Sequence, residues 1–197
     1  MKKIALIAAF VVLSVFASVA HAQQIDAGFS FGTLLSGQGK TVNGLLFPTV
    51  GGGLYPGFNA DFLLRRHFGL EGDISWRASQ NLYGGGQPFR PIFYSFDAIW
   101  APPITKNISA EVLAGIGAEN VRFYTNGFNC SSFTGCTNYN TTTHFMGDFG
   151  GGIRAYFWRD AFIRPEVRLY LINNNVEFSS GYATRVGATI GYSFGRR

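Results

Sequence analysis

The sequence predicts an all-β fold: an eight-stranded antiparallel transmembrane β-barrel, with the strands connected as an up-and-down meander. Three observations predict it. Along eight segments, large apolar residues alternate with small or polar ones, as in strands that have two different faces. The connections between these segments are alternately long and short. Charged residues are only 14% of the 197 residues, against about 25% in a typical soluble domain, yet the mean hydropathy is only +0.12.

The rest of the composition excludes several other classes of protein. The chain has 26 glycines, and 16% of its residues are aromatic. This argues against a disordered protein, a coiled coil and a helical transporter, and the glycines lack the three-residue period of collagen. The basic residues are scattered or lie in turns, so the isoelectric point of 9.4 does not indicate a nucleic-acid site.

The first residues resemble an export signal. Lys2 and Lys3 precede an apolar run over residues 4–16, and Ala20-His21-Ala22 fits the small-x-small cleavage pattern. We therefore expect a cleaved signal peptide at residues 1–22 and a single barrel domain at residues 23–197. The alternative is a membrane anchor helix, for which the apolar stretch is barely long enough.

Each predicted strand shows an alternation of period two. Residues 68–77 are the clearest, with Phe68, Leu70, Ile74 and Trp76 on one face and acidic or small residues between them. Pro56 and Pro165 lie inside two of the strands, where each removes one backbone donor. The expected strands are residues 25–31, 54–64, 68–77, 92–100, 108–119, 143–157, 162–171 and 182–194.

The lengths of the connections predict an orientation in the membrane. Outer-membrane barrels have short periplasmic turns and longer extracellular loops. The short connections expected here are 65–67, 101–107 and 158–161, and the long ones are 35–48, 79–89, 123–142 and 172–181. An even number of strands in this order places both termini in the periplasm and the chain in the bacterial outer membrane.

The alternation also separates the charges from the apolar side chains. Nine of the eleven acidic residues fall on the small, polar face together with five arginines, and a charge facing lipid at mid-membrane costs about 2–4 kcal/mol. We therefore expect this face to line the lumen, with acids and arginines paired. The alternative is a soluble barrel with an apolar ligand cavity, and Ile99 and Leu113 are apolar exceptions on the polar face. The expected lumen network comprises Asp61, Glu71, Asp73, Asp97, Glu111, Asp148, Arg154, Arg164, Glu166, Arg168 and Arg185.

The two cysteines predict a disulfide. Cys130 and Cys136 flank a short loop, and an exported protein meets an oxidising compartment. A metal site is the alternative, but two thiols without nearby histidine or acidic ligands do not complete a tetrahedral set.

The last strand carries a resemblance to a known family. Arg185, Gly187, Ile190, Tyr192 and Phe194 resemble the C-terminal signal that the barrel-assembly machinery reads in outer-membrane barrels. Together with Asn59-Ala-Asp61, residues 68–73 and residues 164–168, the chain resembles the small eight-stranded barrels: the transmembrane domain of outer membrane protein A, its X-type relatives and the opacity-type porins. Gly195-Arg196-Arg197 extends past the usual terminal Phe of that signal.

No motif points to catalysis, a cofactor or a metal. Residues 36–41 lack the first glycine of a phosphate-binding loop. Neither His67 nor His144 is followed by the serine that an outer-membrane deacylase places two residues later. Glu71, Asp73, Glu111 and Glu119 are expected to be partners of the arginines.

We therefore expect a non-enzymatic outer-membrane protein with a structural or surface-interaction role through its loops. A narrow pore for small solutes or ions is the alternative, and a lipid-modifying enzyme is a third class. The expected partners are outer-membrane lipids and lipopolysaccharide, the assembly machinery during insertion, and a ligand at the loops. Nucleic acid is not expected as a partner, and the chain is expected to be a monomer.

Overall fold

All eight predicted strands are present, and they close into a ring. The computed structural model describes residues 24–37, 40–42, 45–47, 49–65, 67–83, 86–131, 135–178 and 180–195, so the expected signal segment 1–22 lies outside the described residues. Within the described ranges, no helix is long and apolar enough to cross a membrane. The strands are β1 (Gln24–Ser36), β2 (Lys40–Val42), β3 (Leu45–Phe47), β4 (Leu54–Arg65), β5 (Phe68–Trp76), β6 (Asn81–Tyr83), β7 (Gln87–Trp100), β8 (Pro103–Thr105), β9 (Ile108–Ser131), β10 (Gly135–Trp158), β11 (Ala161–Ile172) and β12 (Tyr182–Phe194).

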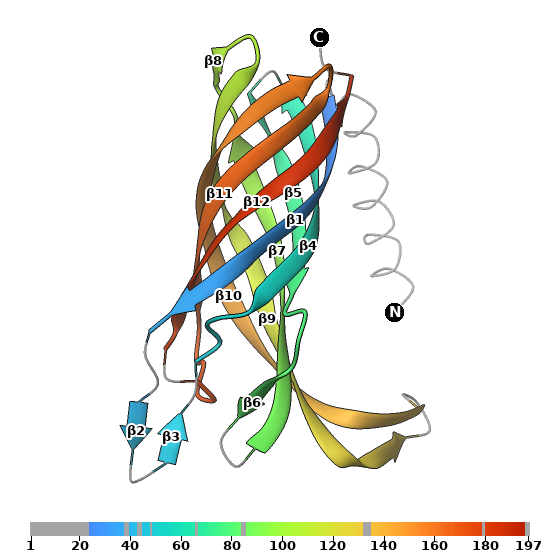
Figure 1. Cartoon of the computed structure of the whole chain (residues 1–197), viewed down its shortest axis with the longest axis vertical. Helices are drawn as coiled ribbons and strands as arrows, with labels where there is room; N and C mark the ends of the chain where they lie inside the picture. Colours follow the sequence, from blue (N-terminus) through green and yellow to red (C-terminus); the bar gives the residue numbers. More distant parts are fainter. Residues whose placement is uncertain are drawn as a thin grey trace, which may run out of the picture.

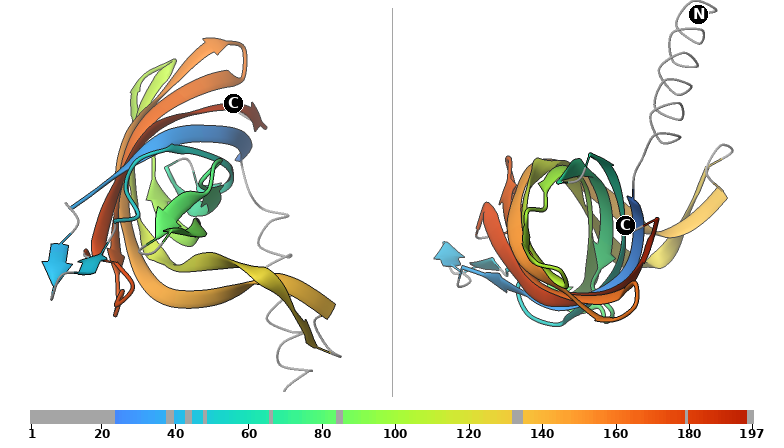
Figure 2. Two further views of the ribbon diagram at one scale, coloured as in Figure 1. Left: turned by 60° about the horizontal axis from the view of Figure 1, so that its bottom comes forward. Right: turned by 90° about the horizontal axis from the view of Figure 1, so that it is seen from above.

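The ring follows the order of the chain. Its strands pair antiparallel in the order β1, β4, β5, β7, β9, β10, β11 and β12, and β12 pairs back onto β1 (Figure 1). This last pairing runs from Ile25 opposite Phe194 to Ser36 opposite Ala183. The view along the barrel in Figure 2 (right) shows the closed ring. Closure leaves none of the eight strands with an unpaired edge inside the barrel wall.

The two ends of the barrel differ in their connections. At one end, called here the short-turn end, β4 leads to β5 and β10 leads to β11 through only a few residues. Arg159 takes the left-handed conformation in the second of these turns, with φ 47°. Figure 1 shows β8 and the end of β12 at this end, and β2, β3, β6 and the far ends of the paired β9 and β10 at the other, called the long-loop end.

The face assignment follows from the alternation of buried and exposed residues. In β11, Arg164, Glu166 and Arg168 are buried inside the ring, whereas the residues between them are exposed. The same parity buries Asp26, Asp97 and the other predicted inward acids. The soluble barrel with an apolar interior is therefore excluded, because the charged face is the inner one.

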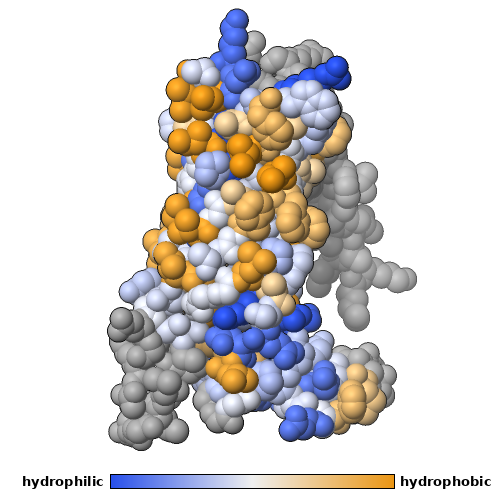
Figure 3. All heavy atoms as spheres, in the orientation of Figure 1, coloured by the Kyte–Doolittle hydropathy of each residue, from blue (hydrophilic) through white to orange (hydrophobic). Residues whose placement is uncertain are grey.

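The outer wall is an apolar belt. Phe96 of β7 and Ile116 of β9 lie opposite each other with 58% and 59% of their surface exposed. Figure 3 shows apolar side chains covering the barrel wall on the face drawn, with hydrophilic residues beyond them toward the long-loop end. Trp100, Phe157 and Trp158 are exposed near the short-turn end, where an aromatic girdle belongs. A water-soluble monomer rarely exposes an apolar patch of more than about 300–600 Å², so this surface indicates a barrel embedded in lipid.

The predicted connection over residues 123–142 is wrong in extent. β9 and β10 are each 24 residues long, and together they carry paired backbone out to Ser131 and Gly135. The threonines and tyrosines of this segment favour a strand, and cross-strand pairs extend the hairpin well past the barrel. The other connections also contain short strands that were not predicted, namely β2 and β3, β6, and β8. In addition, β7 begins at Gln87 rather than at residue 92.

Candidate functional site: the filled lumen and the long-loop end

The middle of the lumen holds four buried arginines. Arg154 comes from β10, Arg164 and Arg168 from β11, and Arg185 from β12, and none is more than 2% exposed. These strands are neighbours, so the guanidinium groups leave from one side of the wall. Most of the carboxylates that they meet come from the opposite side, on β1, β4, β5, β7 and β9. The ion pairs therefore cross the lumen and link the two halves of the ring.

Arg164 lies at the centre of this network. Its Nη1 is 2.6 Å from Oε2 of Glu71 and 3.0 Å from Oε2 of Glu111, and its Nη2 is 3.0 Å from Oε2 of Glu166. Asp61 also pairs with Arg164, at 3.3 Å. One guanidinium thus joins carboxylates from β4, β5, β9 and β11, which is the geometry expected of a buried cation that needs several partners.

The other three arginines extend the network along the barrel axis. Arg154 pairs with Asp26, Asp61 and Glu111. The structure thus adds Asp26 to the predicted members, and its place on the inward face of β1 was the available signal. The remaining pairs are Arg168 with Glu71, with Asp97 and Asp148 at 3.1 Å each and with Glu166 at 3.3 Å, and Arg185 with Asp73 at 2.9 Å and with Glu166 at 2.7 Å.

A small apolar layer lies beside the ion pairs, on the wall formed by β4, β7 and β9. Leu63, Ile99, Ala101 and Leu113 pack together near the short-turn end, each no more than 7% exposed. Ile99 and Leu113 are the two apolar exceptions on the polar face, and the register explains them. Ile99 lies opposite Leu113 and also opposite Gly69, which itself pairs with Leu63. A side chain at Gly69 would meet the backbone of Phe62 and Leu63 in the neighbouring strand.

A second apolar layer closes the lumen toward the long-loop end. The rings of Phe93 and Tyr170 stack across it with centroids 5.0 Å apart. Phe178, from the connection between β11 and β12, packs on Phe89 with ring centroids 5.2 Å apart and is only 5% exposed. The sequence did not predict Phe178 here, because a residue in an irregular connection has no periodic signal for its direction.

Glu177 fixes this connection next to Phe178. Its Oε2 lies 2.8 Å from Nε2 of His144, and its backbone carbonyl accepts a hydrogen bond of 2.6 Å from the hydroxyl of Tyr83. Burial and the Glu177 carboxylate raise the pKa of the Tyr83 phenol, which keeps that hydroxyl protonated as a donor. Asp148, on the same face of β10 as His144, pairs with Arg168 instead.

Glu119 differs from the other inward carboxylates. It was expected to pair with the arginines, but neither of its carboxylate oxygens has a hydrogen-bond partner among the described residues. Its neighbours in the register are Phe93 and His144, so it lies in the aromatic layer beyond the reach of the four arginines. No group of three His, Cys, Asp or Glu side chains in the described ranges is placed to hold a metal ion.

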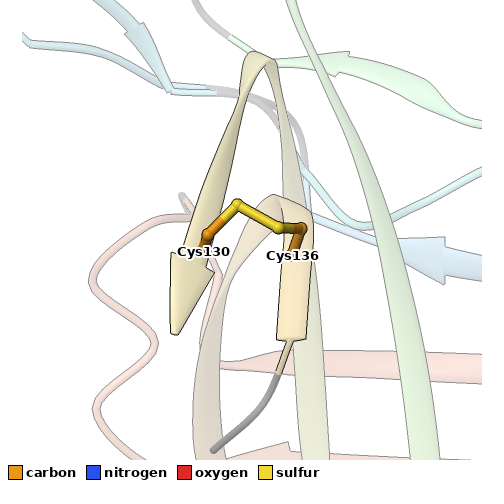
Figure 4. Close-up of a disulfide and its surroundings, with 2 residues drawn as sticks. All are labelled: Cys130 and Cys136. Carbon is orange, nitrogen blue, oxygen red and sulfur yellow. A yellow bond between two sulfur atoms is a disulfide. The ribbon is translucent and has the colours of Figure 1, made fainter. Parts of the chain in front are cut away.

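The β9–β10 hairpin projects beyond the ring at the long-loop end (Figure 2, left). Cys130 and Cys136 lie opposite each other near its tip and are joined by a disulfide, as predicted (Figure 4). Phe128 is 74% exposed on the same arm. The hairpin therefore presents a cross-linked strand pair with an exposed aromatic side chain outside the barrel.

Comparisons with known proteins bear on the fold. A scan against protein-family models finds no match, and a search of curated proteins finds no relative. Among solved structures, the chain is similar to Neisserial surface protein A, with a TM-score of 0.60, 10% identity and coverage of 87% of this chain and 96% of that one. It is also similar to the N-terminal β-barrel domain of Pseudomonas aeruginosa OprF, with a TM-score of 0.56, 14% identity and coverage of 87% and 98%.

A third similar structure is Ail, the attachment invasion locus protein of Yersinia pestis, in complex with the heparin analogue sucrose octasulfate. The TM-score is 0.55, the identity is 13%, and the coverage is 87% of this chain and 97% of that one. The chain has the fold of the small eight-stranded outer-membrane barrels. At 10–14% identity the similarity concerns the fold alone.

In this outer-membrane barrel, the predicted insertion segment forms the closing strand β12. Ile190, Tyr192 and Phe194 are exposed on the outer wall, and the rings of Tyr192 and Phe194 lie 4.9 Å apart. Arg185 points into the lumen, and Gly187 lies opposite Gly32 of β1. The segment thus combines an outward apolar edge with an inward charge on the strand that seals the ring.

Proposed function

We propose that this chain is a non-enzymatic outer-membrane protein with a closed lumen, which displays its long-loop end at the cell surface. The observation that carries the proposal is that buried side chains fill the lumen: the four arginines with their carboxylates, the apolar layer beside them, and an aromatic layer toward the long-loop end. The interior of an eight-stranded barrel is just wide enough to be filled by side chains. A filled interior favours a structural or surface role over transport.

The long-loop end supplies the surface for interaction. The β9–β10 hairpin offers polar and aromatic side chains that adapt well to a ligand, and the disulfide limits the freedom of its tip. Ail, whose fold is similar, is known in complex with a heparin analogue. By this reasoning the expected ligand of the present chain also meets the loops, and the short-turn end with both termini lies in the periplasm.

An enzymatic role has less support. The His144 imidazole is bound to Glu177 rather than to a serine, and Phe145 and Met146 follow it in the sequence. A general base needs its nucleophile within hydrogen-bond reach. Comparing lipid A mass profiles of cells with and without the protein tests this point, and a changed profile would contradict the proposal.

Planar bilayers test whether the lumen is closed. We expect the purified barrel to insert without steady conductance, whereas a general porin in the same bilayer gives open steps. Steady steps on the nanosiemens scale would overturn the closed barrel and favour the narrow pore.

Epitope insertion tests the orientation. A short tag inserted between residues 132 and 134 should be reached by antibody on intact cells, whereas a tag inserted next to Lys106 should be reached only after permeabilisation. A mobility shift between unboiled and boiled samples of the outer-membrane fraction reports that each tagged chain is folded. The opposite pattern of access would reverse the proposed orientation.

A further inference from the structure

Two arginines stand opposite each other on the outer wall of the barrel. Arg90 of β7 and Arg122 of β9 are paired in the register, and both are half-buried. They lie six residues beyond Phe96 and Ile116, on the same outward face. At a rise of ~3.3 Å per residue and a tilt of ~40°, six residues move the side chains about 15 Å along the barrel axis. This places the pair where the lipid headgroups begin, at the long-loop end.

No carboxylate side chain is available to neutralise this pair. The chain has eleven acidic residues, and nine of them are buried inside the ring. Asp160 lies in the turn at the opposite end, and Glu177 is bound to His144. Like charges directly opposite each other in a sheet are destabilising. An anion bound between the two arginines would therefore relieve the repulsion between their positive charges.

Local contacts hold both guanidinium groups in place. The Arg122 guanidinium lies over the Tyr139 ring at 5.0 Å from its centroid, and Nη2 of Arg90 donates to the carbonyl of Ala78 at 3.3 Å. The Nε atom of each arginine is buried and has no hydrogen-bond partner among the described residues. Because both Nε atoms are buried, the terminal Nη groups are the donors left for an anion, and a phosphate group accepts two or more hydrogen bonds from arginine.

The side chains around the pair are those that bind sugars. Tyr124 and Tyr139 form a ring pair at 6.0 Å beside Arg122, and the Asn120 amide donates to the Thr143 hydroxyl at 2.9 Å on the same outward face. We propose that Arg90 and Arg122 bind the phosphate of a phosphorylated glycolipid in the surrounding leaflet. That this leaflet is the outer one rests on the proposed orientation.

The test uses the detergent-purified full barrel, in which orientation plays no part. Native mass spectrometry measures retention of bisphosphorylated lipid A, of lipid A without phosphates, and of bisphosphorylated lipid A in the presence of equimolar inorganic phosphate. We expect the double variant Arg90→Gln and Arg122→Gln to bind bisphosphorylated lipid A about tenfold more weakly than the unaltered chain. Inorganic phosphate should not displace the lipid.

A matched control removes two positive charges at the other end. The double variant Lys106→Gln and Arg159→Asn should bind as the unaltered chain does, and the asparagine suits the left-handed conformation of residue 159. Equal losses in both variants, undiminished binding by the Arg90 and Arg122 variant, or equal binding of phosphate-free lipid A would each overturn the proposal. Displacement by equimolar phosphate would overturn the assignment to a lipid. The heat-dependent mobility shift reports the barrel separately, so failure of the site is distinguishable from failure of the proposed function.

Discussion

Arg185 and Asp73 join opposite walls of the lumen through two parallel contacts. Nη1 of Arg185 donates to Oδ1 of Asp73 at 2.9 Å, and Nη2 donates to Oδ2 at 3.2 Å. The arginine belongs to β12 and the aspartate to β5, and β1 and β4 separate these strands in the ring. A bidentate pair fixes the orientation of the guanidinium group as well as its distance from the carboxylate, so it links the closing strand firmly to β5 across the lumen.

Breaking this pair from one side should weaken the barrel. In Asp73→Asn, Glu166 is the one charged partner within 4 Å that Arg185 keeps among the described residues. Loss of one member of a buried pair costs about 3–5 kcal/mol, and the remaining partner places the expected loss near the lower value. A urea titration of the heat-dependent mobility shift, carried out in lipid vesicles, measures the change in the free energy of unfolding.

The double variant Asp73→Asn and Arg185→Met is the control for that measurement. Glu166 retains Arg164 and Arg168 when Arg185 is removed, so no carboxylate of this part of the network is left alone. Replacement of a whole buried pair is far less destabilising than removal of one partner. The double variant should therefore be more stable than Asp73→Asn, and the reverse order would contradict the role given to the pair.

The apolar layer at the short-turn end gives a second prediction. Leu113→Ala removes buried methyl groups from a packed cluster and should cost about 2–5 kcal/mol. Ile116→Ala, three residues along the same strand but facing outward, should cost less because lipid replaces the lost contacts. Both are measured by the same titration. Similar losses for the two variants would show that the layer does not pack as described.

The ring and its two faces could be predicted because they depend on the regular alternation of side chains along a β-strand. Successive side chains in a strand point to opposite faces, so the position of Glu71 or Arg164 in the sequence decides which face carries it. Neither Pro56 nor Pro165 broke its strand: Pro56 pairs with Phe31 and Pro165 with Ala188. A network inside the ring follows once the inner face is known.

The long-loop end could not be predicted in the same way. Phe178 and Glu177 enter the lumen from an irregular connection, where no period fixes the direction of a side chain. The contact of His144 with Glu177 depends on how that connection folds back. Glu119 shows the same limit, because its face was predicted correctly but its depth relative to the four arginines was not.

A charge on the apolar belt gives a third prediction. Ile116 is 59% exposed near the middle of the outward row of β9, so Ile116→Arg should destabilise the barrel in vesicles by about 2–4 kcal/mol. Asn120→Arg, at the headgroup end of the same row, should cost only about 0–1 kcal/mol. The difference between the two depths is the readout. Equal costs would contradict a membrane-embedded belt.

Reduction of the disulfide gives a fourth prediction, which separates the hairpin from the ring. Cys130 and Cys136 lie near the tip, whereas the pairing of β9 with β7 ends at Phe123 and that of β10 with β11 ends at Met146. Among the described residues, no strand outside the hairpin pairs with the tip, which depends on its own pairs and the disulfide. We expect reduction to leave the urea midpoint of the barrel unchanged and to expose the segment between Tyr124 and Tyr139 to protease. The double variant Cys130→Ser and Cys136→Ser should reproduce both results without a reductant. A lowered barrel midpoint in either case would show that the disulfide stabilises the ring itself.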